Sequence, residues 1–104
     1  MNFADKVYAL CKRIPKGKVS TYKEIGRALG GKGQVYRAVG RALKENKDPA
    51  SIPCFRVVKS NGEIGGYGGS APQNIQRKIK KLKAEGIEIK NNKIDLKKYL
   101  FKFV

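Results

Sequence analysis

The stretch that decides the fold is residues 21–45, TYKEIGRALGGKGQVYRAVGRALKE. Thr21 and Glu24 have the spacing of a capping box, so a helix is expected to begin after Thr21 and to end near Gly30. Residues 34–45 predict a second helix, because their apolar side chains recur at helical spacing. Two helices joined by a short glycine-containing turn are typical of helix-turn-helix proteins. Any helical hairpin of a basic protein would show this pattern, so it does not decide the function.

The segment after these helices predicts a β-hairpin. Residues 55–59 have the composition of a strand, and Asn61-Gly62 is a strong hairpin turn before a return strand at Glu63-Ile64. A hairpin that follows a helix-turn-helix is the layout of a winged helix. We therefore expect a mainly α-helical fold with a small β wing, that is, a winged-helix DNA-binding domain.

Residues outside this region predict further helices. Residues 3–13 read as an amphipathic helix, Val19-Ser20 as a short strand, and the segment from Pro72 to Gly86 as a last helix. The exposed face of this last helix is expected to carry its basic residues: Arg77, Lys78, Lys80, Lys81 and Lys83. The tail, residues 99–104, is apolar and is expected to pack on the core. All 104 residues are expected to form one domain.

Composition narrows the class of partner. The chain has 24 Lys and Arg against 8 Asp and Glu, a formal net charge of +16, which indicates a polyanion as partner. Nucleic acid is the first candidate and an anionic membrane surface the second. The chain shows neither a transmembrane run nor a signal peptide. We expect a monomer in the cytoplasm, associated with the nucleoid, and no membrane partner.

The two cysteines, Cys11 and Cys54, do not form a pattern typical of a disulfide framework. Without histidine, a zinc site is not expected, and no other metal or cofactor is indicated. Cys11 lies on the apolar side of the first helix and is expected in the core. Cys54 follows Pro53 and lies near Arg56, a setting that could favour a thiolate nucleophile. A buried structural cysteine is the alternative.

Several short motifs occur in one order along the chain. They are Ile14-Pro15-x-Gly17-x-Val19-x-Thr21-Tyr22, Arg37-Ala38-Val39-Gly40, Asn46, Ile52-Pro53-Cys54-x-Arg56-Val57-Val58, Gly62, Gly65-Gly66-Tyr67 and Glu85-Gly86. Their ordered combination closely resembles the C-terminal domain of the O6-alkylguanine-DNA alkyltransferases, also called methylated-DNA–protein cysteine methyltransferases. The resemblance covers about residues 3–86.

The resemblance implies a catalytic role for a small set of residues. Cys54 would accept the alkyl group irreversibly, so that each molecule acts once. Tyr22 would help to rotate the damaged nucleotide, Asn46 would brace the turn beneath the site, and Glu85 would end a proton relay. Each has an ordinary alternative: Tyr22 could be an aromatic at the edge of the core and Glu85 a residue at a helix end.

The resemblance also implies a DNA-binding face. Arg37 would fill the gap that the flipped nucleotide leaves in the stack, and small residues would allow the helix to approach the minor groove. Arg37 could instead contact only phosphate. The implied DNA-binding residues are Arg37, Tyr22, Ala38, Gly40, Arg41 and Arg56, and the implied pocket residues are Tyr67, Gly66, Gly68, Pro53 and Val58.

The chain departs from the family at two positions. Phe55 stands where the family has a histidine that links the cysteine to the glutamate through water, and Phe cannot transfer a proton. We therefore expect alkyl transfer to be slow and to rise with pH, because a free thiol with a pKa of ~8.5 is only partly ionised at neutral pH. Tyr36 precedes the implied finger, where a small residue is usual.

Three functions follow from these observations. The first is a single-turnover methylated-DNA–[protein]-cysteine S-methyltransferase that acts on double-stranded DNA containing O6-alkylguanine. The second is an alkyltransferase-like protein that binds the lesion without transfer and signals to a nucleotide excision repair partner. The third is a general winged-helix DNA-binding protein.

Overall fold

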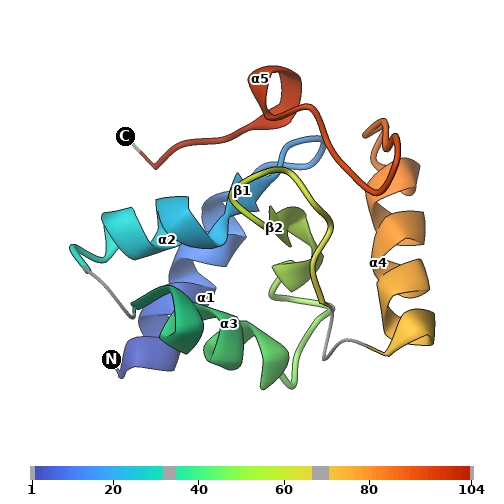
Figure 1. Cartoon of the computed structure of the whole chain (residues 1–104). Helices are drawn as coiled ribbons and strands as arrows, with labels where there is room; N and C mark the ends of the chain where they lie inside the picture. The colour runs from blue at the N-terminus through green and yellow to red at the C-terminus, as the bar shows by residue number, and fades with distance from the viewer. Residues whose placement is uncertain (1, 32–34, 67–70, 104) are drawn as a thin grey trace.

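The computed structural model describes residues 2–31, 35–66 and 71–103 of the chain (Figure 1). The elements in chain order are α1 (Phe3–Arg13), β1 (Ser20–Thr21), α2 (Tyr22–Ala28), α3 (Val35–Lys44), a 3-10 helix (Cys54–Arg56), β2 (Val57–Val58), α4 (Pro72–Ala84) and α5 (Leu96–Tyr99). The structure is mainly helical with a small sheet, as the sequence predicts.

Helix α1 packs against α3. The side chain of Asn2 caps α1 by accepting a hydrogen bond from the amide of Asp5 at 2.8 Å, because the first amides of a helix have no partner within it. The buried residues of α1 are Val7 and Cys11, and the core position predicted for Cys11 is confirmed. The Tyr8 hydroxyl donates to the Ala42 carbonyl at 2.7 Å and ties the two helices together.

Helices α2 and α3 lie close together. The Thr21 hydroxyl accepts from the Glu24 amide at 3.1 Å and starts α2, and Gly30, with a φ of 72°, lies just past its end in the left-handed region. A Cβ on Gly26 would lie 2.8 Å from the Tyr36 ring, so glycine is required there. The Tyr36 ring of α3 therefore packs directly on the backbone of α2 at Gly26, although 40% of Tyr36 remains exposed.

The sheet differs from the predicted strand and hairpin. Residues 54–56 form a 3-10 turn, and β2 pairs with β1 in parallel, with Ser20 opposite Val57 and Thr21 opposite Val58. Residues 59–63 do form a tight turn, because the Lys59 amide donates to the Glu63 carbonyl at 2.9 Å. The chain after this turn does not return along β2, since Glu63 makes a bridge with Lys93 instead.

Two groups of apolar side chains form the core. The first joins α1, α2 and α3 and includes Cys54 and Val57. The second joins β2, α4 and the C-terminal segments and includes Phe55 and Leu82. Figure 1 shows the 3-10 turn and β2 between the three N-terminal helices and α4. Cys54 and Val57 therefore pack in the first core group, while Phe55 and Val58 pack in the second.

The C-terminal tail packs on the first core group, as predicted. The Phe101 amide donates to the Val19 carbonyl at 2.7 Å, and Phe101 and Phe103 meet edge to face with centroids 5.2 Å apart. The preceding helix α5 was not predicted. It begins at Asp95, whose carboxylate accepts from the Lys97 amide at 3.0 Å.

Candidate functional site

Cys54 begins the 3-10 turn and has a free thiol. Its amide donates to the Ile52 carbonyl at 2.7 Å. The Asn46 side-chain amide donates to the same carbonyl at 3.1 Å, and the Asn46 side-chain oxygen accepts from Asp48. Asn46 thus holds the loop that precedes the cysteine. Cys54 is only 8% exposed, so the structure places it at the edge of the core rather than on an open surface.

A cavity of about 530 Å³ opens beside Cys54. This volume falls within the usual range for small-ligand sites. The cavity lies between the end of α3 with the following loop, on one side, and α4 on the other. Its other described lining residues are Leu43, Asn46, Pro49, Asn74, Arg77, Lys80 and Lys81. The buried Cys54 therefore lines a cavity that has cationic residues on its opposite wall.

Lys78 is completely buried, which corrects its predicted place on a solvated face. Its ammonium donates to the carbonyls of Val57 at 2.7 Å, Ile64 at 2.5 Å and Gly66 at 3.1 Å. Burial lowers the pKa of Lys78 to about 7, and a thiolate at Cys54 acts in the opposite direction. Three acceptors match the three donors of a protonated lysine, so this geometry suits the charged form.

The sequence contains a signal for the burial of Lys78. The residue lies three positions after Ile75 and four before Leu82, on the same face of α4 as these apolar residues. Lysine is almost never fully buried without partners. The charge of Lys78 therefore favours an exposed position, although its neighbours on this face are apolar. The partners are backbone carbonyls from other segments, which no local pattern reveals.

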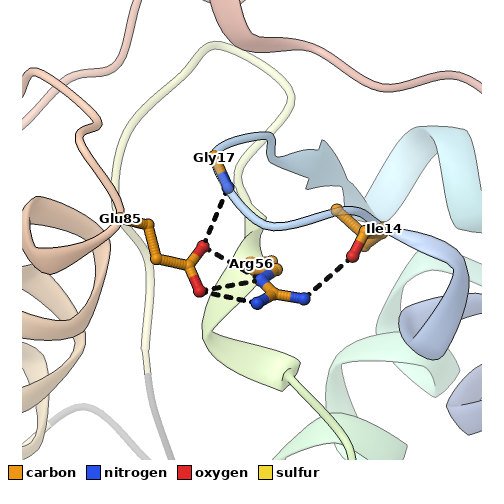
Figure 2. A network of polar contacts seen from close by, with 4 residues as sticks. All are labelled: Ile14, Gly17, Arg56 and Glu85. Carbon is orange, nitrogen blue, oxygen red and sulfur yellow. Dashed lines mark hydrogen bonds and ion pairs between the residues drawn. The ribbon is translucent and has the colours of Figure 1, made fainter.

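Glu85 and Arg56 form an ion pair at the end of α4 (Figure 2). Arg56 donates through Nη2 to Oε2 of Glu85 at 2.6 Å and through Nη1 to the Ile14 carbonyl at 2.9 Å. Glu85 also accepts from the Gly17 amide at 3.2 Å. The side chains are 17% and 9% exposed. The two groups therefore join α4, the 3-10 turn and the loop after α1.

The exposed face of α3 is basic and shallow. Arg37, Ala38 and Arg41 are exposed, while Val39 is buried. A Cβ on Gly40 would meet no atom within 4 Å, so packing within the protein does not require glycine there.

Tyr22 packs against the core group that contains Cys54, but it is not among the described residues that line the cavity at Cys54. It is the first residue of α2, and its hydroxyl lies 3.2 Å from where a Cβ on Gly65 would be. It lines a separate cavity of about 340 Å³ with Tyr36 and Lys59. Burial raises the pKa of the Tyr22 phenol, and the charge of a Cys54 thiolate adds to the rise. Tyr22 is therefore a neutral hydroxyl at ordinary pH.

The predicted pocket residues do not all meet at Cys54. Val58 is fully buried, Pro53 is half-buried, and the exposed Gly66 lines another cavity with Gly65. Tyr67 and Gly68 lie outside the described residues. The basic residues of α4 line the cavity instead, and sequence reasoning assigned them no specific role.

The comparisons with known proteins agree on one family. The model of the 6-O-methylguanine DNA methyltransferase DNA binding domain matches residues 2–87. The chain belongs to this family.

Two curated relatives of this alkyltransferase family differ in size. A bifunctional methyltransferase/endonuclease of Picrophilus torridus is 43% identical over 95 residues, 91% of this chain and 30% of the relative. A DNA base-flipping protein of Vibrio parahaemolyticus is 42% identical over 98 residues, 93% of both chains. The chain therefore spans less than a third of one relative and nearly all of the other.

A solved structure of the family matches over nearly its whole length. The crystal structure of S. pombe Atl1 in complex with damaged DNA containing O6-carboxymethylguanine superposes with a TM-score of 0.83. It is 38% identical and covers 96% of this chain and 94% of that chain. The expected helix-turn-helix fold with a wing and the expected DNA-binding class are thereby confirmed.

Phe55 replaces the histidine of the family motif and is 8% exposed. Cations flank its ring: the Arg56 guanidinium carbon lies 5.3 Å and the Lys81 ammonium 5.4 Å from the centroid. Glu85 is engaged by Arg56 on the same turn. At position 55 the chain therefore has a phenyl ring, which cannot donate or accept a proton.

The described helices are too short or too polar to cross a membrane.

Proposed function

We propose that this chain binds double-stranded DNA containing O6-alkylguanine with the damaged nucleotide flipped out, and that Cys54 accepts the alkyl group. The observation that carries the proposal is a free cysteine beside a chamber large enough for a small ligand, in a chain of this DNA-binding family. The basic face of α3 is available for the DNA, with Arg37 as the residue that replaces the flipped nucleotide in the stack.

The transfer is a displacement at the alkyl carbon. The Cys54 thiol loses its proton to water, and the thiolate sulfur attacks the carbon bound to O6. A C–S bond forms while the C–O6 bond breaks, and the electron pair stays on the guanine, which takes up a proton. The thioether is stable, so each protein molecule turns over once. Phe55 cannot carry the thiol proton, and we expect the rate to rise with pH as the thiolate fraction increases.

A second function is favoured by the environment of Phe55. Its buried ring has no group that could pass a proton from Cys54 to Glu85, and Glu85 is already bound by Arg56. A protein of this kind can flip and hold the lesion without transfer. The full-length similarity to a DNA base-flipping protein and to alkyltransferase-like protein 1 of Schizosaccharomyces pombe supports this alternative. A repair protein that reads the flagged lesion would then be the partner.

Intact mass after incubation with an O6-methylguanine duplex, followed by peptide mapping, separates the two functions. Transfer predicts a gain of one methyl group on Cys54, absent in Cys54→Ala and retained in Cys11→Ala. No gain together with preferential binding of the damaged duplex would establish lesion recognition alone. Equal affinity for damaged and undamaged duplexes, with no gain of mass, would overturn both functions.

A further inference from the structure

The cavity beside Cys54 has walls of opposite character. One wall consists of Leu43, Asn46 and Pro49, which carry no charge. The facing wall comes from α4 and presents Arg77, Lys80 and Lys81, with Asn74 beside them. The described lining includes no acidic residue. A neutral alkyl group such as methyl would make no use of these cations.

The cations of this wall form no ion pair with an acidic residue of the part of the chain that the structure describes. Within residues 2–31, 35–66 and 71–103, the ion pairs are Arg27–Glu24 and Arg56–Glu85. Arg77, Lys80 and Lys81 belong to neither pair, and their residues are exposed. Unpaired cations on one wall of a concave site concentrate positive potential in it.

Lys81 contacts the residue that follows Cys54 in the chain. Its ammonium lies 5.4 Å from the centre of the Phe55 ring, a cation–π distance. Phe55 follows Cys54 directly in the chain, and Cys54 and Lys81 line the same cavity. The phenylalanine in the family's histidine position thus contacts a cation that lines the same cavity as Cys54.

The geometry points to a preference for O6-alkyl groups that end in an anion, such as a carboxylate one carbon beyond the oxygen. This inference rests on the proposed function and names its substrate class. The reacting carbon must lie at the Cys54 sulfur, so a substituent on this carbon extends into the chamber. A carboxylate there would meet the α4 wall and form charge-assisted hydrogen bonds.

The competing use of the same wall is contact with a DNA phosphate. A phosphate contact would strengthen binding of damaged and undamaged duplexes alike. The inclusion of Cys54 in the lining of the same cavity favours the substituent on the lesion over the backbone, because the sulfur must reach the alkyl carbon and not a phosphate. The two interpretations predict different affinities when the charge of the alkyl group changes and the DNA sequence stays the same. Only a contact with the alkyl group makes the affinity depend on that charge.

The test compares affinities for four duplexes of one sequence at one ionic strength. They carry O6-carboxymethylguanine, the uncharged isostere O6-carbamoylmethylguanine, O6-methylguanine or guanine. We expect the protein to bind the carboxymethyl duplex about tenfold more tightly than the carbamoylmethyl duplex, as one charge-assisted hydrogen bond would give. A Cys54→Ala background keeps transfer from interfering with the equilibrium.

The variant Arg77→Gln/Lys80→Gln/Lys81→Gln is expected to reduce this ratio to about one. Lys83→Gln is the matched control, since Lys83 is exposed on the same helix but does not line the cavity. It should lower all four affinities together and keep the ratio. Thermal unfolding checks that the variants fold.

Two outcomes would overturn the inference. One is equal affinity of the protein with the unchanged cationic wall for the carboxymethyl and the carbamoylmethyl duplexes. The other is an equal loss for all four duplexes in the wall variant, which would assign the cations to phosphate. In either case a retained preference for O6-methylguanine over guanine shows that the proposed function stands. Loss of that preference as well would show that the proposed function itself fails.

Discussion

Helices α3 and α4 are both rich in arginine and lysine, yet they use the charge differently. In α3 the buried stripe is apolar, and Arg37 and Arg41 point to solvent. In α4 one lysine, Lys78, replaces an apolar residue in the core and binds backbone carbonyls of two other segments. The comparison teaches that equal composition does not imply equal function, because the surroundings decide whether a cation stays solvated or becomes part of the framework.

The largest effect that separates the two helices is expected for Lys78→Ala. The substitution leaves the carbonyls of Val57 and Ile64 without their donor in a buried site, so the free energy of unfolding should fall by ~3–5 kcal/mol. Lys80→Ala, on the exposed side of α4, should change it by less than ~0.5 kcal/mol. Urea unfolding at pH 7 measures both. Equal losses would show that α4, like α3, carries only surface charge.

Glu85→Gln tests whether the end of α4 serves structure or catalysis. Its carboxylate joins Arg56 and Gly17, so the neutral amide should lower the free energy of unfolding by about 2 kcal/mol. Because Phe55 carries no proton, we expect the rate of alkyl transfer and its pH profile to stay unchanged below the unfolding temperature. Glu88→Gln, at an exposed residue, is the control. If a folded Glu85→Gln protein transfers the alkyl group more slowly, Glu85 takes part in catalysis despite Phe55.

On α3, Arg37→Ala should weaken binding of an O6-methylguanine duplex by about tenfold, because the gap left by the flipped nucleotide is no longer filled. Arg27→Ala is the matched control, since Arg27 is exposed and forms a surface pair with Glu24 on α2. Fluorescence anisotropy with labelled duplexes measures both. If the two variants lose the same affinity for damaged and undamaged DNA, Arg37 contributes only to the general charge of the face.

The buried lysine of α4 is also expected to make stability depend on pH, by a small amount for each pH unit. Burial lowers the pKa of Lys78 from 10.5 to about 7, so above pH 7 the unfolded chain binds more protons at this residue than the folded chain. The free energy of unfolding should therefore rise between pH 7 and 9, by at most ~1.4 kcal/mol per pH unit. The gain is lost as the pH falls toward 7.

The window ends at pH 9 because another buried group then acts in the opposite direction. Burial raises the pKa of Cys11 from 9.0 to about 12, so the folded chain holds the Cys11 proton longer, and above pH 9 this group opposes the rise in stability that Lys78 gives. Urea unfolding of the Lys78→Ala protein provides the comparison. A slope that persists between pH 7 and 9 without Lys78 would assign the dependence to other groups.

Local chemistry made the N-terminal half of this fold predictable. Thr21 and Glu24 start a helix through a hydrogen bond between near neighbours, and the apolar residues of α1 and α3 recur at helical spacing. The family also follows from sequence, because its motifs are short, ordered and spread over residues 2–87. The predicted strand over residues 55–59 is confirmed only at Val57–Val58, because residues 54–56 form a 3-10 turn that places Cys54 and Phe55 in different core groups.

The sequence by itself determined the class of partner, helices α1 to α4 and the identity of the candidate acceptor, Cys54. The charge of the chain and the spacing of its apolar residues are properties that any contiguous segment reveals. Only the tertiary structure decided that Lys78 is buried, that Arg56 binds Glu85 and that the cations of α4 face Cys54. Each of these contacts joins residues more than twenty positions apart or depends on backbone carbonyls, whose positions exist only once the chain has folded.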